Sequence, residues 1–332
     1  MLCPLRLLSD HALLSHLPAS HQARKLVESD AAKLYAGWKG EQNLAYYLKC
    51  ISDPTIRIFY DLHLKECQID VLLLTPTFLS ILEVKNYSGV LSFYNDLGQV
   101  VRTMGGRREG FANPILQANR HRMYVQQWLT ERHFPDILIE TDVVIAHPST
   151  IVDSSDKTVK EHVFHAEKAP IKLQRMINNY QGSPNYSRFL PQIEKALLND
   201  HHDPFPDVLQ KFGVSSTDLQ RGVLCEACHH FSMQRISANW QCARCGHRSK
   251  NAHRSMILHY FLLFGPTMTN KQCRDFLKID NAKLMIDLLN KMNLKREGIG
   301  PGRGQYYCSP SYETFDQLLS PEINNRIWKA KD

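Results

Sequence analysis

The chain has 332 residues, of which 43% are hydrophobic and 22% are charged. This composition is ordinary for a globular protein and excludes collagen-like chains, disulfide scaffolds and disordered chains. No stretch reaches the roughly 18 consecutive apolar residues that a membrane-spanning helix needs, so we expect no membrane partner. Polar residues such as Asp10 and His11 interrupt the leucine-rich start, and no small-residue cleavage site follows it. We therefore expect no secretory signal and a cytoplasmic location.

The net charge of +7 is distributed unevenly along the chain. Residues 1–220 carry 23 Lys and Arg against 24 Asp and Glu, whereas residues 221–332 carry 17 against 9. A polyanion such as nucleic acid is therefore the expected partner of the last third of the chain. A basic end that serves only solubility would give the same count, and the count carries no information on the oligomeric state.

Hydrophobic periodicity and turn residues divide the first 200 residues into helices and strands. A helical pattern runs from about residue 22 to residue 50, with a break near Gly37 to Gly40. The expected strands are 56–60, 69–74, 78–84, 90–94, 99–103 and 137–146, and the later helices are 113–130, 170–180 and 187–198. Helices on both sides of a run of strands predict an α/β or α+β domain.

The segment from residue 68 to residue 86 predicts a β-hairpin with acidic side chains near its open end. If residues 75–78 form the turn, Asp70 lies directly opposite Glu83, with Cβ atoms about 4.5–5.5 Å apart. Lys85 then points to the same face as Glu83. Like charges facing each other in an apolar hairpin are destabilising unless a divalent cation such as Mg²⁺ joins them. The alternative is a solvated Glu83–Lys85 pair with Asp70 capping a turn.

Five sequence elements, in this order, resemble the nuclease-related domain, called NERD, of the PD-(D/E)XK nuclease superfamily. They are Gly40-Glu41, Gln68-Ile-Asp70, Ile81-Leu-Glu83-Val-Lys85-Asn86, Gly89 and Asn113-Pro114-x-x-Gln117. The resemblance covers about residues 37–150. It implies a restriction-endonuclease-like α/β core with a mixed sheet flanked by helices. The proline that usually precedes the first aspartate of the superfamily motif is absent here, and Gln68-Ile69 stands in its place.

The resemblance also implies which residues bind a metal ion. Asp70 and Glu83 would bind Mg²⁺ or Mn²⁺, with the carbonyl of Val84 nearby. Lys85 would position the attacking water and stabilise charge. The implied reaction is the hydrolysis of a phosphodiester bond, in which the metal activates water and neutralises charge on the phosphate.

Two further residues receive a role from the resemblance, Glu41 as an auxiliary acid and Gln117 as an amide that faces the site. From the residues alone, Glu41 is explained equally well by the positive end of a helix that starts near Gly40. His121 falls one turn after Gln117 on the same helix face, where we expect a surface histidine; the alternative is a role in the site.

Four cysteines, Cys225, Cys228, Cys242 and Cys245, form two C-x-x-C pairs that are separated by 13 residues. This spacing is typical of a structural Zn²⁺ site in a zinc ribbon. Three nearby histidines could substitute as ligands, but four thiolates already complete a tetrahedron. The alternative is a redox pair or a disulfide, which a doubled motif disfavours.

The last 80 residues predict a winged helix-turn-helix. A helix over 257–264 is followed by a capping box at Thr269, a third helix capped by Asp280-Asn281, and a glycine-rich basic wing over 295–307. In this fold the third helix enters the major groove and the wing contacts phosphates. The expected nucleic-acid-binding residues are Lys283, Lys291, Lys295, Arg296 and Arg303. The alternative is a winged helix that binds protein.

The sequence therefore predicts a five-part chain. The parts are an N-terminal helical extension (1–36), a NERD-like nuclease domain (37–200), a linker (201–220), a zinc ribbon (221–252) and a winged-helix-like domain (253–332). We expect a Mg²⁺-dependent nuclease that cuts DNA rather than RNA and is held on DNA by its C-terminal modules. The alternatives are a non-cleaving DNA-binding or interaction protein with a nuclease fold and, third, a structural RNA-binding factor.

Overall fold

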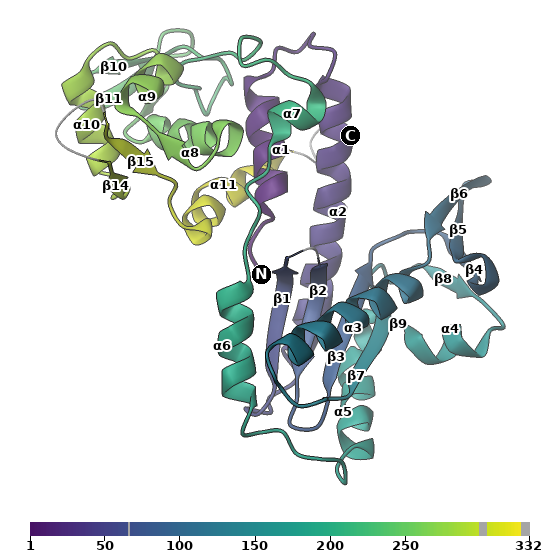
Figure 1. Ribbon diagram of the computed structural model, residues 1–332. Helices are drawn as coiled ribbons and strands as arrows, with labels where there is room; N and C mark the ends of the chain where they lie inside the picture. Colours follow the sequence, from purple (N-terminus) through teal and green to yellow (C-terminus); the bar gives the residue numbers. More distant parts are fainter. Residues whose placement is uncertain (66, 299–303, 327–332) are drawn as a thin grey trace. The chain divides into compact units, whose positions relative to one another are not determined.

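The computed structural model describes residues 1–65, 67–298 and 304–326 (Figure 1). The chain divides into two compact units. The first unit contains Met1 and residues 36–203, and the second contains residues 2–35 and 204–332. Within the described residues, every helix is too short or too polar to span a lipid bilayer.

The first unit is built on a five-stranded mixed sheet in the order β1-β2-β3-β7-β9. Its first three strands are antiparallel neighbours, whereas β3, β7 and β9 run parallel. A second sheet has the order β6-β5-β4-β8. The strands are Arg57–Leu64 (β1), Cys67–Leu74 (β2), Leu79–Lys85 (β3), Val90–Tyr94 (β4), Gln99–Met104 (β5), Arg107–Ala112 (β6), Ile139–Ile145 (β7), Ile151–Asp153 (β8) and Val163–His165 (β9).

Helices cover both faces of the five-stranded sheet, so the predicted mixed α/β architecture is confirmed (Figure 1). They are Arg24–Leu48 (α2), Pro114–Glu131 (α3), Lys157–His162 (α4), Ala169–Asn179 (α5) and Leu190–Asp200 (α6), with short 3₁₀ turns at Asn95–Leu97 (η1) and Ala166–Lys168 (η2). On one face Ile81 packs in a cluster with Leu129 of α3 and residues of α6. On the other face Leu82 packs with Leu44 of α2 and Leu173 of α5. Each fully buried leucine contributes about 1.5–3 kcal/mol, which fixes the sheet between its helices.

The β2–β3 hairpin has the predicted register. Val71 pairs with Leu82, and the ladder continues to Leu74 opposite Leu79. At the turn, the Thr75 hydroxyl donates to the Phe78 carbonyl (2.6 Å) and accepts the Phe78 N–H (3.0 Å). This side-chain bridge fixes the turn and therefore the register.

Helix α2 is continuous, so the predicted break near Gly40 is wrong. Gly40 serves a close approach between the helix and the strand ends instead. A Cβ at this position would lie 2.6 Å from the Cβ of Asn86, which follows β3, and 3.2 Å from the Cβ of Ala146, which follows β7. Asn43, one turn later, donates a hydrogen bond to the Ala146 carbonyl (2.6 Å). The helix is thereby held against the carboxyl ends of β3 and β7.

The second unit contains the N-terminal helix, the first part of α2 and the C-terminal third of the chain. Its elements are Leu5–His16 (α1), Val208–Phe212 (α7), Met233–Ile236 (β10), Asn239–Cys242 (β11), Arg248–Ser249 (β12), Ala252–Phe264 (α8), Thr267–Met268 (β13), Asn270–Leu277 (α9), Ala282–Asn290 (α10), Arg296–Glu297 (β14), Tyr306–Cys308 (β15) and Tyr312–Arg326 (α11). The strands form two small sheets, β10-β11-β12 and β13-β15-β14.

Side-chain caps begin two helices of the second unit as the sequence predicts. Thr269 and Gln272 form a reciprocal capping box at α9, and Asn281 accepts the Leu284 N–H (3.0 Å) at α10. The N-terminal segment is held in the same unit, because the Cys3 N–H donates to Asp316 of α11 (2.8 Å).

Alanine substitutions at two glycines of α2 test the close approach at Gly40. A Cβ at Gly37 would have no neighbour within 4 Å, so Gly37→Ala should gain the usual helix benefit of about 0.5–1 kcal/mol in the free energy of unfolding. Gly40→Ala should instead lower it by about 1–3 kcal/mol, because the new Cβ overpacks against Asn86. Urea unfolding of the full chain measures both. Equal stabilisation by the two variants contradicts the close approach.

Candidate active site

A buried carboxylate at the end of β3 is the centre of the candidate site. Glu83 is only 1% exposed, and its two oxygens contact two different cationic or polar groups. Oε1 accepts a hydrogen bond from Lys85 Nζ (2.7 Å), and Oε2 lies 3.3 Å from Nδ1 of His121. Burial alone would raise the pKa of Glu83, but the nearby His121 ring and the Lys85 ammonium outweigh burial and lower it. Glu83 is therefore held as a carboxylate.

Lys85 links β3 to helix α3. Its ammonium donates to Glu83 and to Oε1 of Gln117 on the first turns of α3 (3.2 Å). Burial would lower the pKa of Lys85, but the adjacent Glu83 carboxylate raises it, so the lysine stays protonated. The structure thus brings Glu83, Lys85 and Gln117 together, as the resemblance implied. Helix α3 starts where Asn113 caps it by accepting the Ile115 N–H (2.9 Å), and this start aims Gln117 at Lys85.

The expectation that His121 is a surface residue is wrong. Its side chain is buried against Glu83 at the distance of an ion pair. The i, i+4 spacing from Gln117 placed it on the correct face of α3, but helix periodicity does not tell a site-facing histidine from an exposed one. The sequence signal that could have indicated a site role for His121 is its i, i+4 spacing from Gln117, combined with the expected buried Glu83.

Asp70 lies one residue beyond the last backbone pair of the β2–β3 ladder. Its Oδ2 accepts the N–H of Val84 (2.7 Å), which draws the carboxyl group onto β3 beside Glu83. Burial, and then the charge of Glu83, raise the pKa of Asp70 to about 8. The two acids therefore interact electrostatically across the hairpin. Val84, whose carbonyl the resemblance placed near the metal ion, contacts Asp70 through its amide.

Glu41 reaches the same region from α2. It lies in the interior of the helix, so the alternative of a carboxylate at a helix start does not hold. Burial, and then the charge of Asp70, raise the pKa of Glu41 to about 9. The close approach at Gly40 places this carboxyl group near the ends of the strands. Three acids from three elements thus share one region with Lys85.

This donor set suits a hard divalent cation, which prefers carboxylate oxygens. Burial, and then the neighbouring carboxyl groups, raise the pKa of Asp70 and of Glu41, and a bound cation would favour the ionised form of both. In the described part of the chain, however, these acids do not form a set of three with ligand atoms within 4.8 Å. Glu83 Oε2 makes no hydrogen bond within the described residues, so this oxygen could bind a cation while Oε1 keeps its contact with Lys85.

The four cysteines of the second unit come together as one group. Cys225, Cys228, Cys242 and Cys245 have their Sγ atoms within 4.8 Å of one another. The two closest pairs, Cys225–Cys245 and Cys228–Cys242, are each 3.6 Å apart. Zn–S bonds of about 2.3 Å place tetrahedral sulfurs about 3.8 Å apart, so the geometry fits one Zn²⁺. A hydrogen bond with Ser232 lowers the pKa of Cys242 to about 5, whereas burial raises the pKa of Cys225 and of Cys245.

A second group of metal-binding residue types, His63, His201 and Asp203, also has ligand atoms within 4.8 Å of one another. Asp203 Oδ1 lies 3.6 Å from His63 Nδ1 and 3.6 Å from His201 Nε2. However, His201 Nδ1 accepts the His63 N–H (3.2 Å), so the neutral ring carries its proton on Nε2, the atom that a metal would need. The group therefore fits a polar clamp that holds residues 201–203 against β1.

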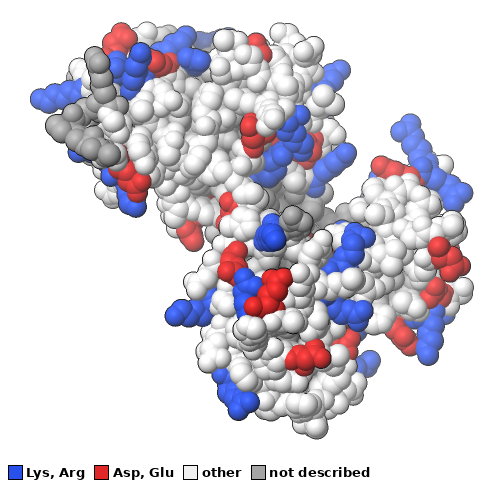
Figure 2. Space-filling model, viewed as in Figure 1, with Lys and Arg blue, Asp and Glu red and all other residues white. Residues whose placement is uncertain are grey.

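Four of the five expected nucleic-acid-binding residues lie exposed on α10, after it and on β14: Lys283, Lys291, Lys295 and Arg296. Lys295 is paired with Glu297 (Nζ to Oε1, 2.5 Å). Arg303 lies outside the described residues. On the face seen in Figure 2, Lys and Arg atoms of the second unit are interspersed with Asp and Glu atoms. On that face, the basic residues of the second unit therefore do not form one continuous patch.

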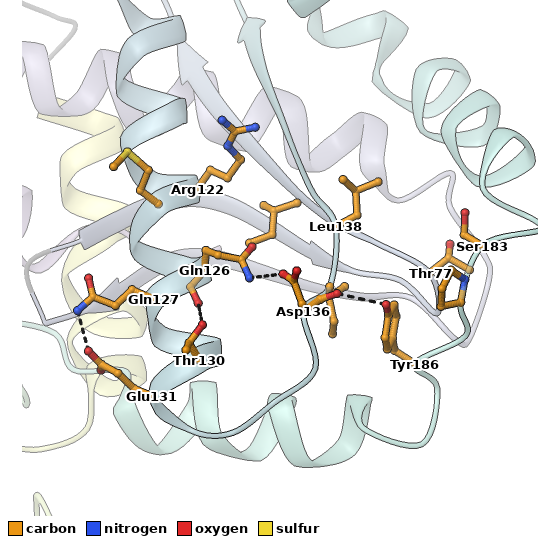
Figure 3. A pocket seen from close by; sticks show the side chains of 14 residues that line it. Thr77, Arg122, Gln126, Gln127, Thr130, Glu131, Asp136, Leu138, Ser183 and Tyr186 are labelled. Carbon is orange, nitrogen blue, oxygen red and sulfur yellow. Dashed lines mark hydrogen bonds between the residues drawn. The ribbon is translucent and has the colours of Figure 1, made fainter.

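A cavity of about 1000 Å³ lies along the second half of α3 (Figure 3). Its polar side chains bond to one another, because Gln126 donates to Asp136 (2.7 Å) and Gln127 donates to Glu131 (2.7 Å). Tyr186 donates to the Asp136 carbonyl (3.2 Å). None of the candidate site residues lines this cavity.

Metal analysis of the purified full chain tests the cysteine group. We expect about one zinc per chain, and loss of this zinc in Cys228→Ser, because three thiolates no longer close the tetrahedron. Cys50→Ser is the control, since Cys50 is an exposed cysteine of the first unit outside the group. A zinc-free wild type, or full zinc in Cys228→Ser, contradicts the assignment.

Comparison with known proteins gives one match. The family model described as the nuclease-related domain, NERD, matches residues 36–146. No curated protein and no solved structure matches the chain. The match includes Glu41, the β2–β3 hairpin and the start of α3, and it does not reach the second unit. Residues 36–146 thus carry the features of the nuclease-related domain, which implies an interaction with nucleic acid and a nuclease-related function.

Proposed function

We propose that the first unit is a divalent-metal-dependent nuclease that hydrolyses phosphodiester bonds of DNA, on a restriction-endonuclease-like core. The observation that carries this proposal is the convergence of Glu41, Asp70, Glu83 and Lys85 at one end of β3, inside the segment that matches the nuclease-related domain. Buried acids with raised pKa values beside a protonated lysine are typical of functional sites rather than of cores.

In this proposal Asp70 and Glu83 hold Mg²⁺ or Mn²⁺, with the Val84 carbonyl as a further oxygen ligand. When bound, the metal activates water and neutralises charge on the phosphate. Lys85 keeps its charge and donates a hydrogen bond to the attacking water or to a phosphate oxygen. Gln117 accepts from Lys85 and so restricts the orientation of the ammonium. His121 fixes the second oxygen of Glu83.

The second unit supports the choice of DNA. Its elements α8-β13-α9-α10-β14-β15 follow the order of a winged helix, with β13, β15 and β14 forming one small sheet. We place α10 in the role of recognition helix, with Lys283 and Lys291 exposed on it or at its end. Together with a zinc ribbon, this module would hold the nuclease near its substrate and raise the local DNA concentration.

One observation favours a second candidate function, a DNA-binding protein that no longer cuts. Both oxygens of Glu83 already contact Lys85 and His121. The Lys85 ammonium therefore compensates the charge of this carboxylate without a metal ion, as in a structural ion pair. In such a protein the winged helix and zinc ribbon would supply the whole function.

Plasmid nicking in Mg²⁺ and in Mn²⁺ separates the two candidates. Asp70→Asn and Glu83→Gln should each lower the nicking rate at least about 100-fold, because each removes a carboxylate that would hold the metal ion. Asp153→Asn, an exposed acid of the same unit, should leave the rate unchanged. A wild type that cuts neither DNA nor RNA with any divalent metal supports the non-cleaving protein instead.

Substitutions of His121 test its role as a positioning residue. His121→Ala should reduce nicking about 10–100-fold and raise the Mg²⁺ concentration needed for half-maximal rate, because Glu83 loses its second contact. His121→Gln should lose less, since its amide can still donate to Glu83. Met123→Ala, exposed on the same helix, is the control. An unchanged Mg²⁺ dependence in His121→Ala shows that His121 does not position Glu83.

A further inference from the structure

The outer end of the hairpin formed by β5 and β6 buries no apolar side chain, although Val100 at the start of β5 is buried. Its turn consists of Gly105 and Gly106, both with positive φ (55° and 76°), as a two-residue hairpin turn requires. Strand β6 is the edge of its sheet, and all of its residues are exposed except the half-buried Phe111. A hairpin that projects polar residues in this way gains little from burial, so its composition needs another explanation.

This hairpin lies beside the loop that follows the candidate active site. The Ser88 hydroxyl donates to the Met104 sulfur at the tip of the hairpin (3.1 Å), and the rings of Tyr87 and Phe111 stack with centroids 4.7 Å apart. Ser88 is only three residues from Lys85. Because an extended chain spans at most about 3.5 Å per residue, the Cα atoms of Lys85 and Ser88 are within roughly 10 Å.

Three arginines lie on the hairpin, and they differ in their partners. Arg102 is paired with Glu109 (2.6 Å) and covers the ring of Phe111. Arg107 and Arg108 are exposed, and within the described residues neither has an acidic side chain at ion-pair distance. Figure 2 shows Lys and Arg atoms gathered at the outer end of β5 and β6. Two guanidinium groups at this tip are therefore free to bind an external anion.

The side chains of Arg107 and Arg108 lie on opposite faces of the hairpin. Successive strand residues point to opposite faces, so Arg107 shares a face with Met104, its cross-strand partner, and Arg108 shares a face with Tyr94. Tyr94 is 41% exposed, and its hydroxyl lies 3.5 Å from Arg108. Arginine binds phosphate oxygens through parallel N–H groups, and an exposed aromatic ring beside it can stack on a base.

We propose that Arg107 and Arg108 bind backbone phosphates of the DNA strand that enters the candidate active site. The proposal rests on the nuclease function proposed above and adds a substrate contact within the first unit. The arginines position the substrate and take no part in bond cleavage.

Binding measurements with the full chain in EDTA test this contact without cleavage. We would measure the anisotropy of a labelled 30-base-pair duplex from about 50 to 200 mM salt. Each lost phosphate contact lowers the slope of log Kd against log salt by about 0.9, so R107Q/R108Q should lower it by about 1.8 and weaken binding to unrelated sequences alike. R102Q is the matched control, because Arg102 is already paired, and its slope should match the wild type.

Four outcomes decide the proposal. A slope unchanged in R107Q/R108Q overturns it, and so does an equal fall in R102Q, which would indicate a general effect of charge. Self-association of R107Q/R108Q with unchanged DNA binding also overturns it, because the arginines would then protect the exposed edge of β6. If the slope falls as expected but the wild type cuts no DNA with any metal, the contact stands and the nuclease function falls.

Discussion

The charge balance around Glu83 is the constraint on which the candidate site depends. A carboxylate with 1% exposure costs several kcal/mol unless cationic and hydrogen-bonding groups compensate it. Lys85, on the same strand, and His121, on α3, provide this compensation. The position of α3 and the ionisation of Glu83 are therefore coupled. Gln117, one turn before His121 on α3, accepts a hydrogen bond from Lys85 and so fixes the lysine as well. Any displacement of α3 would expose an unbalanced buried charge.

Asp70 and Glu41 lack such a balance. Each comes from an element that is fixed by apolar contacts or close backbone packing, β2 by its hairpin and α2 by the approach at Gly40. Their pKa values are raised because these elements hold the acids near Glu83 and away from water. The fold therefore holds uncompensated acids at the end of β3, which is costly for a core and useful for binding a cation.

The parts of this arrangement that the sequence predicted are those fixed by local chemistry. The turn at Thr75 and the apolar residues around it determine the register that brings Asp70 to β3, and Asn113 determines where α3 starts. The continuity of α2 could not be predicted, because a glycine within a helix pattern suggests a break. The reason for Gly40 is its close packing against Asn86, a residue distant in the sequence. The prediction that His121 is a surface residue was wrong for the same reason, because its contact with Glu83 joins residues that are distant in the sequence. Strand β6 was missed because an exposed edge strand shows no apolar alternation.

A net charge does not by itself describe how this chain would hold a polyanion. The first unit has 18 Lys and Arg against 19 Asp and Glu, so its net charge of −1 gives no long-range attraction to DNA. At physiological salt, however, charges more than about 8 Å apart are largely screened, and only the groups near a phosphate count. Of the acids of the candidate site, Glu83 is buried and Asp70 and Glu41 are half-buried, whereas Arg107 and Arg108 are exposed and have no acidic partner among the described residues. The local surface beside the site can therefore attract a phosphate backbone even though the unit as a whole does not.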